Sequence, residues 1–337
     1  MMSYSSENKE TWNQAVVNHG ADFLQSFQWS EFQKSIGQKV IKQEIAGVPV
    51  QIIKYPLPLK QSYLYAPHVF SAKGKAQSKK LEKELQELKI ICKQEKSIFL
   101  RVDFLREQET ESAAEMRQEL KEAKFKSAPA NYYFSAISQP PFAAHLDIGG
   151  SEEQILSNMR YNTRRSIRLA KERGVAVEQL ENIKSFFNLL TQTSQRKNVG
   201  LHPREHYFKL KQAFGEDLVL LMAYNKKQLL AGAMILFFGE QATYLHAGSL
   251  PGSQNQEAPY LILWQAILEA KKRGCKILDL GAVAPEGSQN HPWQSITTFK
   301  MGWRPKIVNY LSAYDWVNKP FWYKMYCLRK KFSIFNL

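Results

Sequence analysis

The sequence has 337 residues, which is long for one hydrophobic core and sufficient for two compact domains. Hydrophobic residues make up 44% and aromatic residues 12%, so the composition excludes a wholly disordered chain. Lys and Arg number 46 against 31 Asp and Glu, and the net charge of +15 favours a polyanionic partner: nucleic acid, a phosphorylated substrate or an anionic membrane surface.

The chain carries no strong sign of export. Its three cysteines are widely spaced and form no C-x-x-C motif, which argues against a disulfide framework or a zinc knuckle and fits a reducing cytoplasm: Cys92, Cys275 and Cys327. The N-terminal stretch is polar and lacks the apolar core of a signal peptide. No run approaches the roughly 18 apolar residues of a membrane-spanning helix. We therefore expect a cytoplasmic protein.

The first part of the chain alternates between predicted helices and strands. Apolar periodicity predicts helices over 11–19, 28–36, 79–95 and 111–124. Strand-like runs cover 40–47, 48–57, 62–70, 97–105, 131–135 and 142–148. Gly149 and Gly150 then interrupt the pattern.

The second part repeats this plan. Ser151 is a predicted helix N-cap with Gln154 completing a capping box, and one helix is expected from there to Arg173. Further helices are predicted over 182–196, 204–214 and 259–273, with a short one between 291 and 303. Strands are predicted over 175–180, 217–224, 228–238, 242–248, 276–280 and 307–311. The repetition indicates a duplicated α+β unit.

The most informative stretch is GAVAPEGSQNHPWQSITTFKMGW, residues 281–303. It follows the apolar run KILDL, which predicts a buried strand. Lys300 lies between aromatic residues at the end of a predicted helical turn, beside the end of that strand. A cation in such a place is suited to hold an anion or a developing oxyanion.

The HPW and FK-x-G-aromatic motifs of this stretch, together with AYDWVNKPFWYKMY after it, resemble the Fem family. The similarity continues upstream in NMRYNTRRSIRLAKERGVAVE and APYLILWQAILEAKKRGCKILDL. It implies an α+β fold of two acetyltransferase-like (GNAT-type) domains with a cleft between them. The first would cover 1–147, completed by a C-terminal helix over 315–337, and the second 148–314. No insert long enough for the coiled-coil arm of many relatives is present.

The resemblance also implies an activity. Fem proteins transfer amino acids from aminoacyl-tRNA to an amine on the stem peptide of a peptidoglycan precursor, either lipid II or its soluble nucleotide-linked form. The expected partners are therefore aminoacyl-tRNA, as co-substrate, and a precursor with a diphosphate. No cofactor is expected, and peripheral contact with the inner membrane face is a further expectation.

Several site residues follow from the same resemblance. Lys300, with Phe299 beside it, would lie near the reacting ester, although Phe299 is equally explained as a core aromatic. Lys34, in FLQSFQWSEFQKSIG, would contact the precursor diphosphate, although Gln33 competes for that position. Tyr244 and His246, spaced by two on a predicted strand, would line the acceptor site or belong to a half-buried strand.

The richest basic segment lies in the predicted helix after Gly150. Arg160, Arg164, Arg168 and Lys171 are spaced to share one helix face, and guanidinium groups bind phosphate oxygens in pairs. The resemblance assigns Arg164 and Arg168 to the precursor diphosphate. A solvated basic face is the alternative.

Other chemistry is less well supported. Asp279, Glu257 and Asp315 are candidate general bases, and the sequence does not choose among them. HPREH, residues 202–206, fits an inverted zinc-protease pattern, but no third ligand is evident and Pro203 argues against a continuous helix. The pyrophosphate loop of acetyltransferases is missing at the turn SLPGSQNQEAPYLIL. A coenzyme-A-dependent N-acyltransferase and a non-catalytic module that binds RNA or membrane are the alternative functions.

Overall fold

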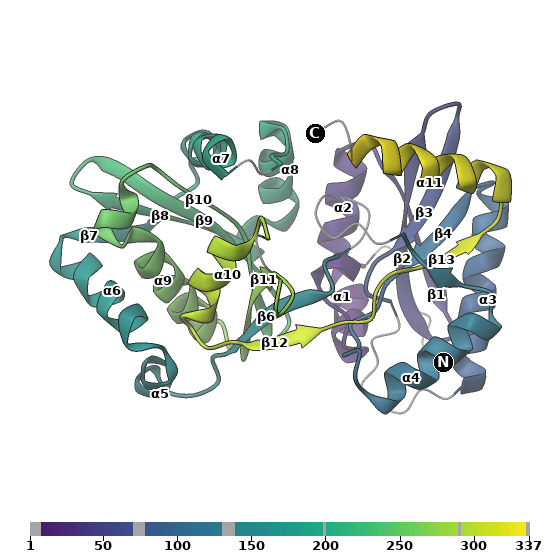
Figure 1. Ribbon diagram of the computed structural model, residues 1–337, viewed down its shortest axis with the longest axis horizontal. Helices are drawn as coiled ribbons and strands as arrows, with labels where there is room; N and C mark the ends of the chain where they lie inside the picture. Colours follow the sequence, from purple (N-terminus) through teal and green to yellow (C-terminus); the bar gives the residue numbers. More distant parts are fainter. Residues whose placement is uncertain (1–7, 70–77, 130–138, 198–199, 289–290, 335–337) are drawn as a thin grey trace. The chain divides into compact units, whose positions relative to one another are not determined.

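The computed structural model describes residues 8–69, 78–129, 139–197, 200–288 and 291–334. Its elements form two compact units, one of Met1–Pro141 with Asn309–Leu337 and the other of Phe142–Val308 (Figure 1). Each unit is a mixed sheet with helices packed on it, which confirms the predicted α+β class. The predicted strand 131–135 lies outside the described residues.

The first unit contains a six-stranded sheet in the order β1-β2-β3-β4-β13-β5. Its strands are β1 (Lys39–Ile45), β2 (Val48–Leu57), β3 (Gln61–Ala66), β4 (Phe99–Val102), β5 (Lys126–Ser127) and β13 (Tyr314–Val317). Its helices are α1 (Lys9–Asn18), α2 (Phe27–Ser35), α3 (Ser78–Gln94), α4 (Glu111–Glu122) and α11 (Pro320–Ile334). The first three strands form consecutive hairpins, and β4 lies parallel to β3.

Both faces of this sheet are covered. Because strand side chains alternate, Leu64 packs with the buried residues of α3 and α4, while Tyr63 and Tyr65 point to the opposite face. There they meet Tyr323 of α11.

The C-terminal end of the chain completes the first unit. Strand β13 lies between β4 and β5, and its Asp315 forms a buried ion pair with Arg101 of β4, with 2.7 Å between Nε and Oδ1. The Tyr323 hydroxyl donates a hydrogen bond of 2.7 Å to Oδ2 of the same carboxylate. Asp315 therefore has a structural role rather than that of a general base.

The second unit contains a seven-stranded sheet in the order β12-β6-β11-β10-β9-β8-β7. Its strands are β6 (Phe142–Asp147), β7 (Val175–Gln179), β8 (Leu218–Asn225), β9 (Gln228–Phe238), β10 (Gln241–Ser249), β11 (Ile277–Ala282) and β12 (Lys306–Asn309). Its helices are α5 (Glu152–Asn158), α6 (Tyr161–Glu172), α7 (Ile183–Lys197), α8 (Arg204–Phe214), α9 (Ala258–Lys272) and α10 (Gln294–Met301). Between β7 and β8, the described residues form α7, α8 and a short 3-10 turn over Gly215–Asp217, and no long helical arm.

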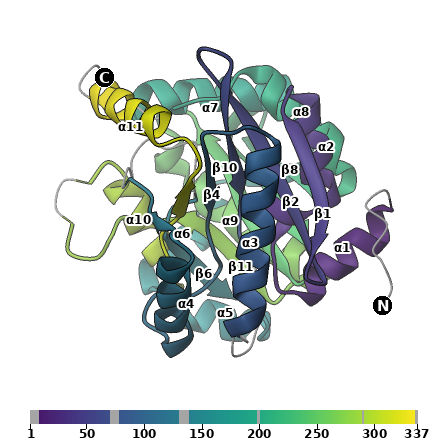
Figure 2. The ribbon, with the colours of Figure 1, turned by 90° about the vertical axis from the view of Figure 1, so that its right-hand side faces the viewer.

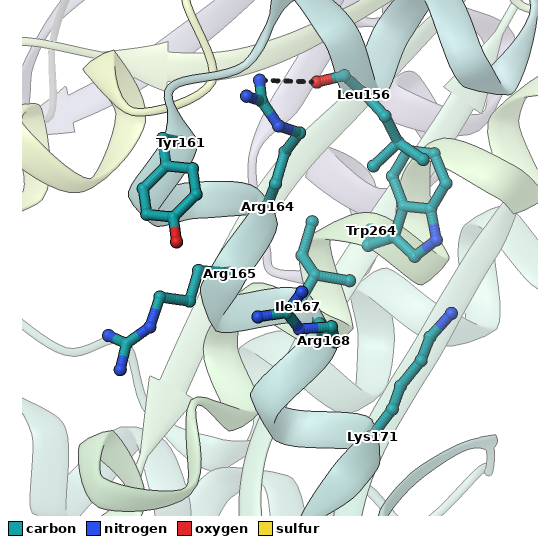
Figure 3. A pocket seen from close by; sticks show the side chains of 8 residues that line it. All are labelled: Leu156, Tyr161, Arg164, Arg165, Ile167, Arg168, Lys171 and Trp264. Atoms are coloured by element: carbon teal, nitrogen blue, oxygen red, sulfur yellow. Dashed lines mark hydrogen bonds between the residues drawn. The ribbon is translucent and has the colours of Figure 1, made fainter.

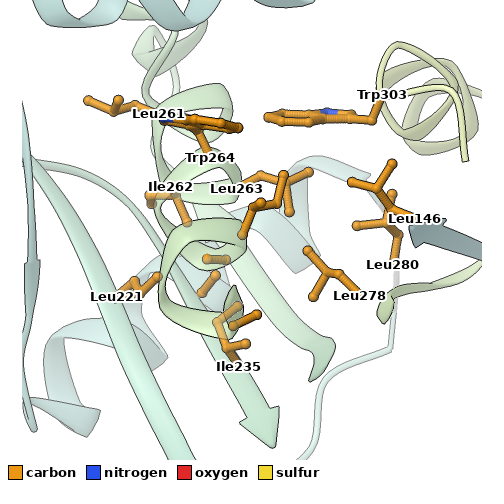
Figure 4. Packing of buried hydrophobic residues seen from close by; sticks show 14 of the residues in the cluster. Leu146, Leu221, Ile235, Leu261, Ile262, Leu263, Trp264, Leu278, Leu280 and Trp303 are labelled. Atoms are coloured by element: carbon orange, nitrogen blue, oxygen red, sulfur yellow. The ribbon is translucent and has the colours of Figure 1, made fainter. Parts of the chain in front are cut away.

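The core of this unit surrounds α9, which is apolar on most of its circumference (Figure 4). Its Ile262 and Leu263 pack among side chains of the sheet, including Leu221, Ile235 and Leu278. A helix with so little polar surface must be buried on several sides, which explains why α6 and α10 also pack near it.

Two features of the second unit differ from what the sequence predicts. Strand β6 was assigned to the first domain, but it pairs with β11 and lies in the second unit. The single helix predicted from Ser151 to Arg173 is two helices, because Met159 and Arg160 are extended, with ψ of 158° and 146°. The capping box of Ser151 and Gln154 is confirmed.

Candidate functional site

Lys300 is held inside the second unit at the end of α10. Its side chain is only 6% exposed, and Nζ donates a hydrogen bond of 2.7 Å to the carbonyl oxygen of Ala282, at the end of β11. A cation in the last turn of a helix also interacts favourably with the helix dipole. One hydrogen of the ammonium group is therefore fixed by the backbone, which orients the remaining two.

The end of β11 is shaped to present that carbonyl group. The Asp279 carboxylate accepts a hydrogen bond of 2.7 Å from the amide of Gly281, forming a local turn. Gly281 has φ of +75°, which a side chain would strain, and the register of β11 against β6 shifts at this point. The turn formed by residues 279–282 thus directs the carbonyl group of Ala282 toward Lys300.

The electrostatics of Lys300 follow from this burial. Loss of water lowers the pKa of Lys300 to about 8, and the negative charge of Asp279 partly opposes the decrease. Because about 8 is above neutral pH, Lys300 is predominantly a cation at pH 7. Asp279 is itself close to His145, with 3.7 Å between Oδ1 and Nε2.

Aromatic side chains at the end of α10 pack with one another and with α9. Phe299 packs edge-on against Tyr260, with 5.0 Å between ring centroids, and both lie against the α9 core. The Trp303 ring is fully buried and stacks 6.3 Å from Tyr260. Phe299 thus packs as part of the core, the alternative that the sequence left open for it.

The predicted basic segment lines a hollow of about 410 Å³ beside α6, to which α5 and α9 also contribute side chains (Figure 3). Among the residues that the structure describes, the lining consists of apolar and aromatic side chains together with cations from successive turns of α6, and it includes no carboxylate. Its lining residues are Leu156, Tyr161, Arg164, Arg165, Ile167, Arg168, Lys171 and Trp264. Such a surface suits a phosphorylated ligand with an apolar portion.

The two arginines assigned to phosphate binding have different surroundings. Nη1 of Arg164 lies 3.3 Å and 3.2 Å from the carbonyl oxygens of Leu156 and Ser157, and it also bonds the carbonyl oxygen of Met159. Arg164 therefore caps the C-terminal end of α5. Arg168 is exposed and lies 3.4 Å from Glu172, a weak surface pair.

The beginning of α6 is attached to the end of α10. The carbonyl oxygen of Gly302 accepts hydrogen bonds from the Thr163 hydroxyl, at 2.9 Å, and from the Arg160 amide, at 3.0 Å. A Cβ atom at Gly302 would lie 2.5 Å from the Thr163 hydroxyl oxygen, so only glycine permits this approach. Lys300 is nevertheless absent from the lining of the α6 hollow. The helices touch, but Lys300 and Arg168 do not share that hollow.

The spacing of Tyr244 and His246 predicts that they share a strand face. In the structure they lie on opposite faces of β10. The register of β10 against β9 shifts between them, so that Tyr244 pairs with Ile235 and His246 with the adjacent Met234. Tyr244 consequently packs against the α9 core, and burial raises its pKa. His246 points to the face covered by α8, where its ring lies 5.1 Å from that of Tyr207. An extra residue in a strand reverses the alternation, which explains the error.

His246 belongs to a histidine cluster that the sequence alone does not predict. The rings of His202 and His206 stack at 3.9 Å, and His246 lies edge-on 6.3 Å from His206. Burial, and secondarily the neighbouring imidazoles, lower the pKa of His206 to about 4 and of His246 to about 3. These two are neutral at pH 7. The i, i+4 spacing of His202 and His206 was a signal in HPREH, but their contact with β10 depends on tertiary structure.

That cluster gives no support to the zinc-protease pattern. Pro203 is the N-cap of α8, so His202 precedes the helix. Among the residues that the structure describes, no group of three His, Cys, Asp or Glu is arranged to hold a metal ion.

Lys34 lies in the first unit, on α2. It is exposed and forms an ion pair of 2.8 Å with Glu31, whereas Gln33 is buried near the Tyr55 hydroxyl. Of the two residues that compete for the family position, Lys34 is therefore the accessible one.

A buried carboxylate in the first unit was also missed. The hydroxyl of Tyr65, in the YAP segment, donates to Asp103 at 2.5 Å, and the His68 amide donates to the same carboxylate at 2.6 Å. Asp103 lies just after β4, and the fold brings its carboxylate against Tyr65 and His68.

Comparison with known proteins places these features in a family. The sequence model of the FemAB family matches residues 5–228 and 222–331. The chain belongs to the FemAB family. It is 22% identical to the lipid II:glycine glycyltransferase of Staphylococcus haemolyticus, over 89% of each chain. Identity to the enzyme of the same name from Staphylococcus aureus strain MRSA252 is 20%, over 90% of each chain.

Solved structures agree with this FemAB assignment at the level of the fold. The crystal structure of FemX superposes with a TM-score of 0.82 at 17% identity, covering 96% of this chain and 99% of FemX. L-PGS from Bacillus licheniformis gives a TM-score of 0.55 at 10% identity, covering 95% and 94%.

Proposed function

We propose that this FemAB protein transfers an amino acid from aminoacyl-tRNA to an amine on the stem peptide of a peptidoglycan precursor. Relatives that cover nearly the whole chain are lipid II:glycine glycyltransferases, which supports peptidoglycan bridge building by amino acid transfer. The observation that carries the proposal is Lys300, a buried ammonium group fixed at the end of β11.

The proposed step is aminolysis of an ester. The acceptor amine attacks the ester carbonyl carbon, and the C–N bond forms as the carbonyl oxygen becomes an oxyanion. Collapse of this intermediate breaks the C–O bond to the ribose, and the proton lost by the amine leaves with the released hydroxyl group. The ester is already activated, so the protein has to supply positioning and charge stabilisation.

Lys300 is the proposed oxyanion stabiliser. Its charge is poorly solvated and its orientation is fixed by Ala282, so little reorganisation is needed when the negative charge develops. Of the three candidate general bases, Asp279 is the one whose charge acts on Lys300. Its carboxylate, however, already accepts a hydrogen bond from the Gly281 amide.

The remaining residues are proposed to bind the substrates. Arg168, with Arg165 and Lys171, would bind the precursor diphosphate in the α6 hollow, and Lys34 would provide a second phosphate contact on the first unit. His246 is a proposed contact for the acceptor. The basic surface would attract tRNA in a salt-dependent manner.

The test is a transfer assay with charged tRNA and either lipid-linked or soluble precursor. We expect Lys300→Met, which removes the charge but fills the space, to lower kcat by on the order of tenfold to a thousandfold. Lys272→Met, at an exposed lysine of α9, is the matched control and should leave kcat unchanged. Wild-type turnover in Lys300→Met would remove Lys300 from the mechanism. Transfer from acetyl-coenzyme A but not from charged tRNA would overturn the proposed function.

A further inference from the structure

Helix α11 has one face that is clearly structural. Its Tyr326 packs on Phe99 of β4, with 4.9 Å between ring centroids, and its Tyr323 is bonded to the buried Asp315. Trp322 and Cys327 pack against the same cluster. This face attaches the helix to the sheet of the first unit, and the opposite face makes none of these contacts.

The opposite face is apolar and exposed. Phe321, Met325 and Leu328 are 69%, 49% and 40% exposed, and they are large hydrophobic residues. Their i, i+4, i+7 spacing places them within an arc of about 60°, opposite Tyr323. A helix packed on a domain usually presents polar residues to water on this side. Here it presents a continuous apolar stripe.

Cations border the stripe on both sides. At about 100° per residue, Lys324 lies at one edge of the stripe and Arg329 at the other, and both are exposed. From Asn318 to Leu337 the sequence contains five Lys or Arg and no Asp or Glu. An apolar stripe with cations along its edges is complementary to a surface that has an apolar interior and negatively charged groups at its boundary with water.

A further exposed apolar residue lies near the start of α11. Leu59 occupies the turn between β2 and β3 and is 75% exposed, with the exposed Lys60 next to it. Nζ of Lys319 donates a hydrogen bond of 3.1 Å to the Gln61 side chain, which connects the base of this hairpin to α11. Two perpendicular views place the turn and the helix at the same end of the first unit (Figures 1 and 2).

We propose that the outer face of α11 and the Leu59 turn form a docking surface for an anionic lipid bilayer. The helix would lie in the plane of the interface, with Phe321, Met325 and Leu328 in the acyl boundary and Lys324 and Arg329 at the phosphate level. A bilayer is favoured over a protein partner because an exposed cation borders each edge of the stripe and the sequence from Asn318 to Leu337 contains no acidic residue. The proposal goes beyond amino acid transfer and does not depend on it.

The test is co-sedimentation of the full chain with phospholipid vesicles. We expect binding to vesicles of phosphatidylglycerol and phosphatidylcholine, and much weaker binding to phosphatidylcholine alone or at high salt. The triple variant Phe321→Ser, Met325→Ser, Leu328→Ser should lower the partition coefficient by about tenfold or more. Leu59→Ser should lower it by a smaller factor. Ile90→Ser, at a residue of α3 that is 52% exposed, is the matched control and should bind as the wild type does.

Two further variants separate charge from hydrophobic contact. Lys324→Glu and Arg329→Glu should weaken binding to the anionic vesicles, with little effect on the residual binding to neutral ones. All the altered side chains are exposed, so the far-ultraviolet circular dichroism spectrum should not change.

Three results would overturn the proposal: wild-type protein that stays in solution with anionic vesicles, a triple variant that binds as the wild type does, or a wild-type dimer that the triple variant converts to monomers. The last would show that a second copy of the chain covers the stripe. Transfer to a soluble precursor should persist in the triple variant, so vesicle binding and the proposed reaction fail independently.

Discussion

At the scale of single residues, the second unit places an ammonium group where water cannot stabilise it. Lys300 has one fixed hydrogen-bond acceptor, Ala282, and one nearby negative charge, that of Asp279. Burial disfavours the charged form, which lowers the pKa to about 8 while leaving the cation predominant at neutral pH. The residue is therefore close to losing its charge under mildly alkaline conditions.

This leads to a prediction about pH. Because Lys300 is protonated below its pKa of about 8 and neutral above it, the rate of transfer should fall as the pH rises through about 8. The measurement is single-turnover transfer between pH 6.5 and 9.5. Lys300→Arg is the control, because a guanidinium group stays charged over this range and its alkaline decrease should be absent. Identical pH profiles for the two proteins would mean that Lys300 does not titrate in the reaction.

At the scale of elements, most helices and strands were predictable because their periodicity and end signals are local. The capping box at Ser151 and the strand before Gly281 are examples. The interruption between α5 and α6 was not predictable, because it depends on bonds from Thr163 and Arg160 to Gly302, about 140 residues away in the sequence. The irregular register of β10 likewise has no signal in ATYLHAGS, so the faces of Tyr244 and His246 could not be assigned.

The contact between α5 and α6 leads to a prediction that distinguishes the role of Arg164 from that of Arg168. Arg164→Ala leaves carbonyl groups at the end of α5 without their cap, and should lower the free energy of unfolding by about 1 kcal/mol. Arg168→Ala should leave stability unchanged but raise the KM for the precursor by about tenfold, with kcat unchanged. Chemical denaturation and steady-state kinetics measure the two effects. An unchanged stability together with a raised KM for Arg164→Ala would instead assign Arg164 to phosphate binding.

At the scale of the whole molecule, the chain divides into two units that are not consecutive in sequence. The first needs β13 and α11, and the second is continuous from Phe142 to Val308. Sequence similarity to the Fem family implied that the C-terminal helix returns to the first domain, but it did not identify the ion pair of Arg101 and Asp315 that holds β13. Sequence positions separated by 214 residues gave no local signal for this contact.

Removing one partner of that pair should destabilise the first unit. Asp315→Ala leaves the Arg101 charge buried without compensation, and should lower the free energy of unfolding by about 3–5 kcal/mol. Glu172→Ala, which breaks an exposed pair, should change it by less than about 1 kcal/mol. Denaturant unfolding monitored by fluorescence compares them. Equal effects of the two substitutions would show that the buried pair does not hold β13 in place.

The position of β13 also has a consequence for synthesis of the chain. The strand lies between β4 and β5, so the sheet of the first unit has a gap until Tyr314–Val317 have left the ribosome. The other five strands of this sheet are complete at Ser127, whereas β13 begins at Tyr314, just after β12 (Lys306–Asn309) has completed the second sheet. The half of the protein that is translated first is thus the half that closes last, and during that interval the edges of β4 and β5 are open to wrong pairing.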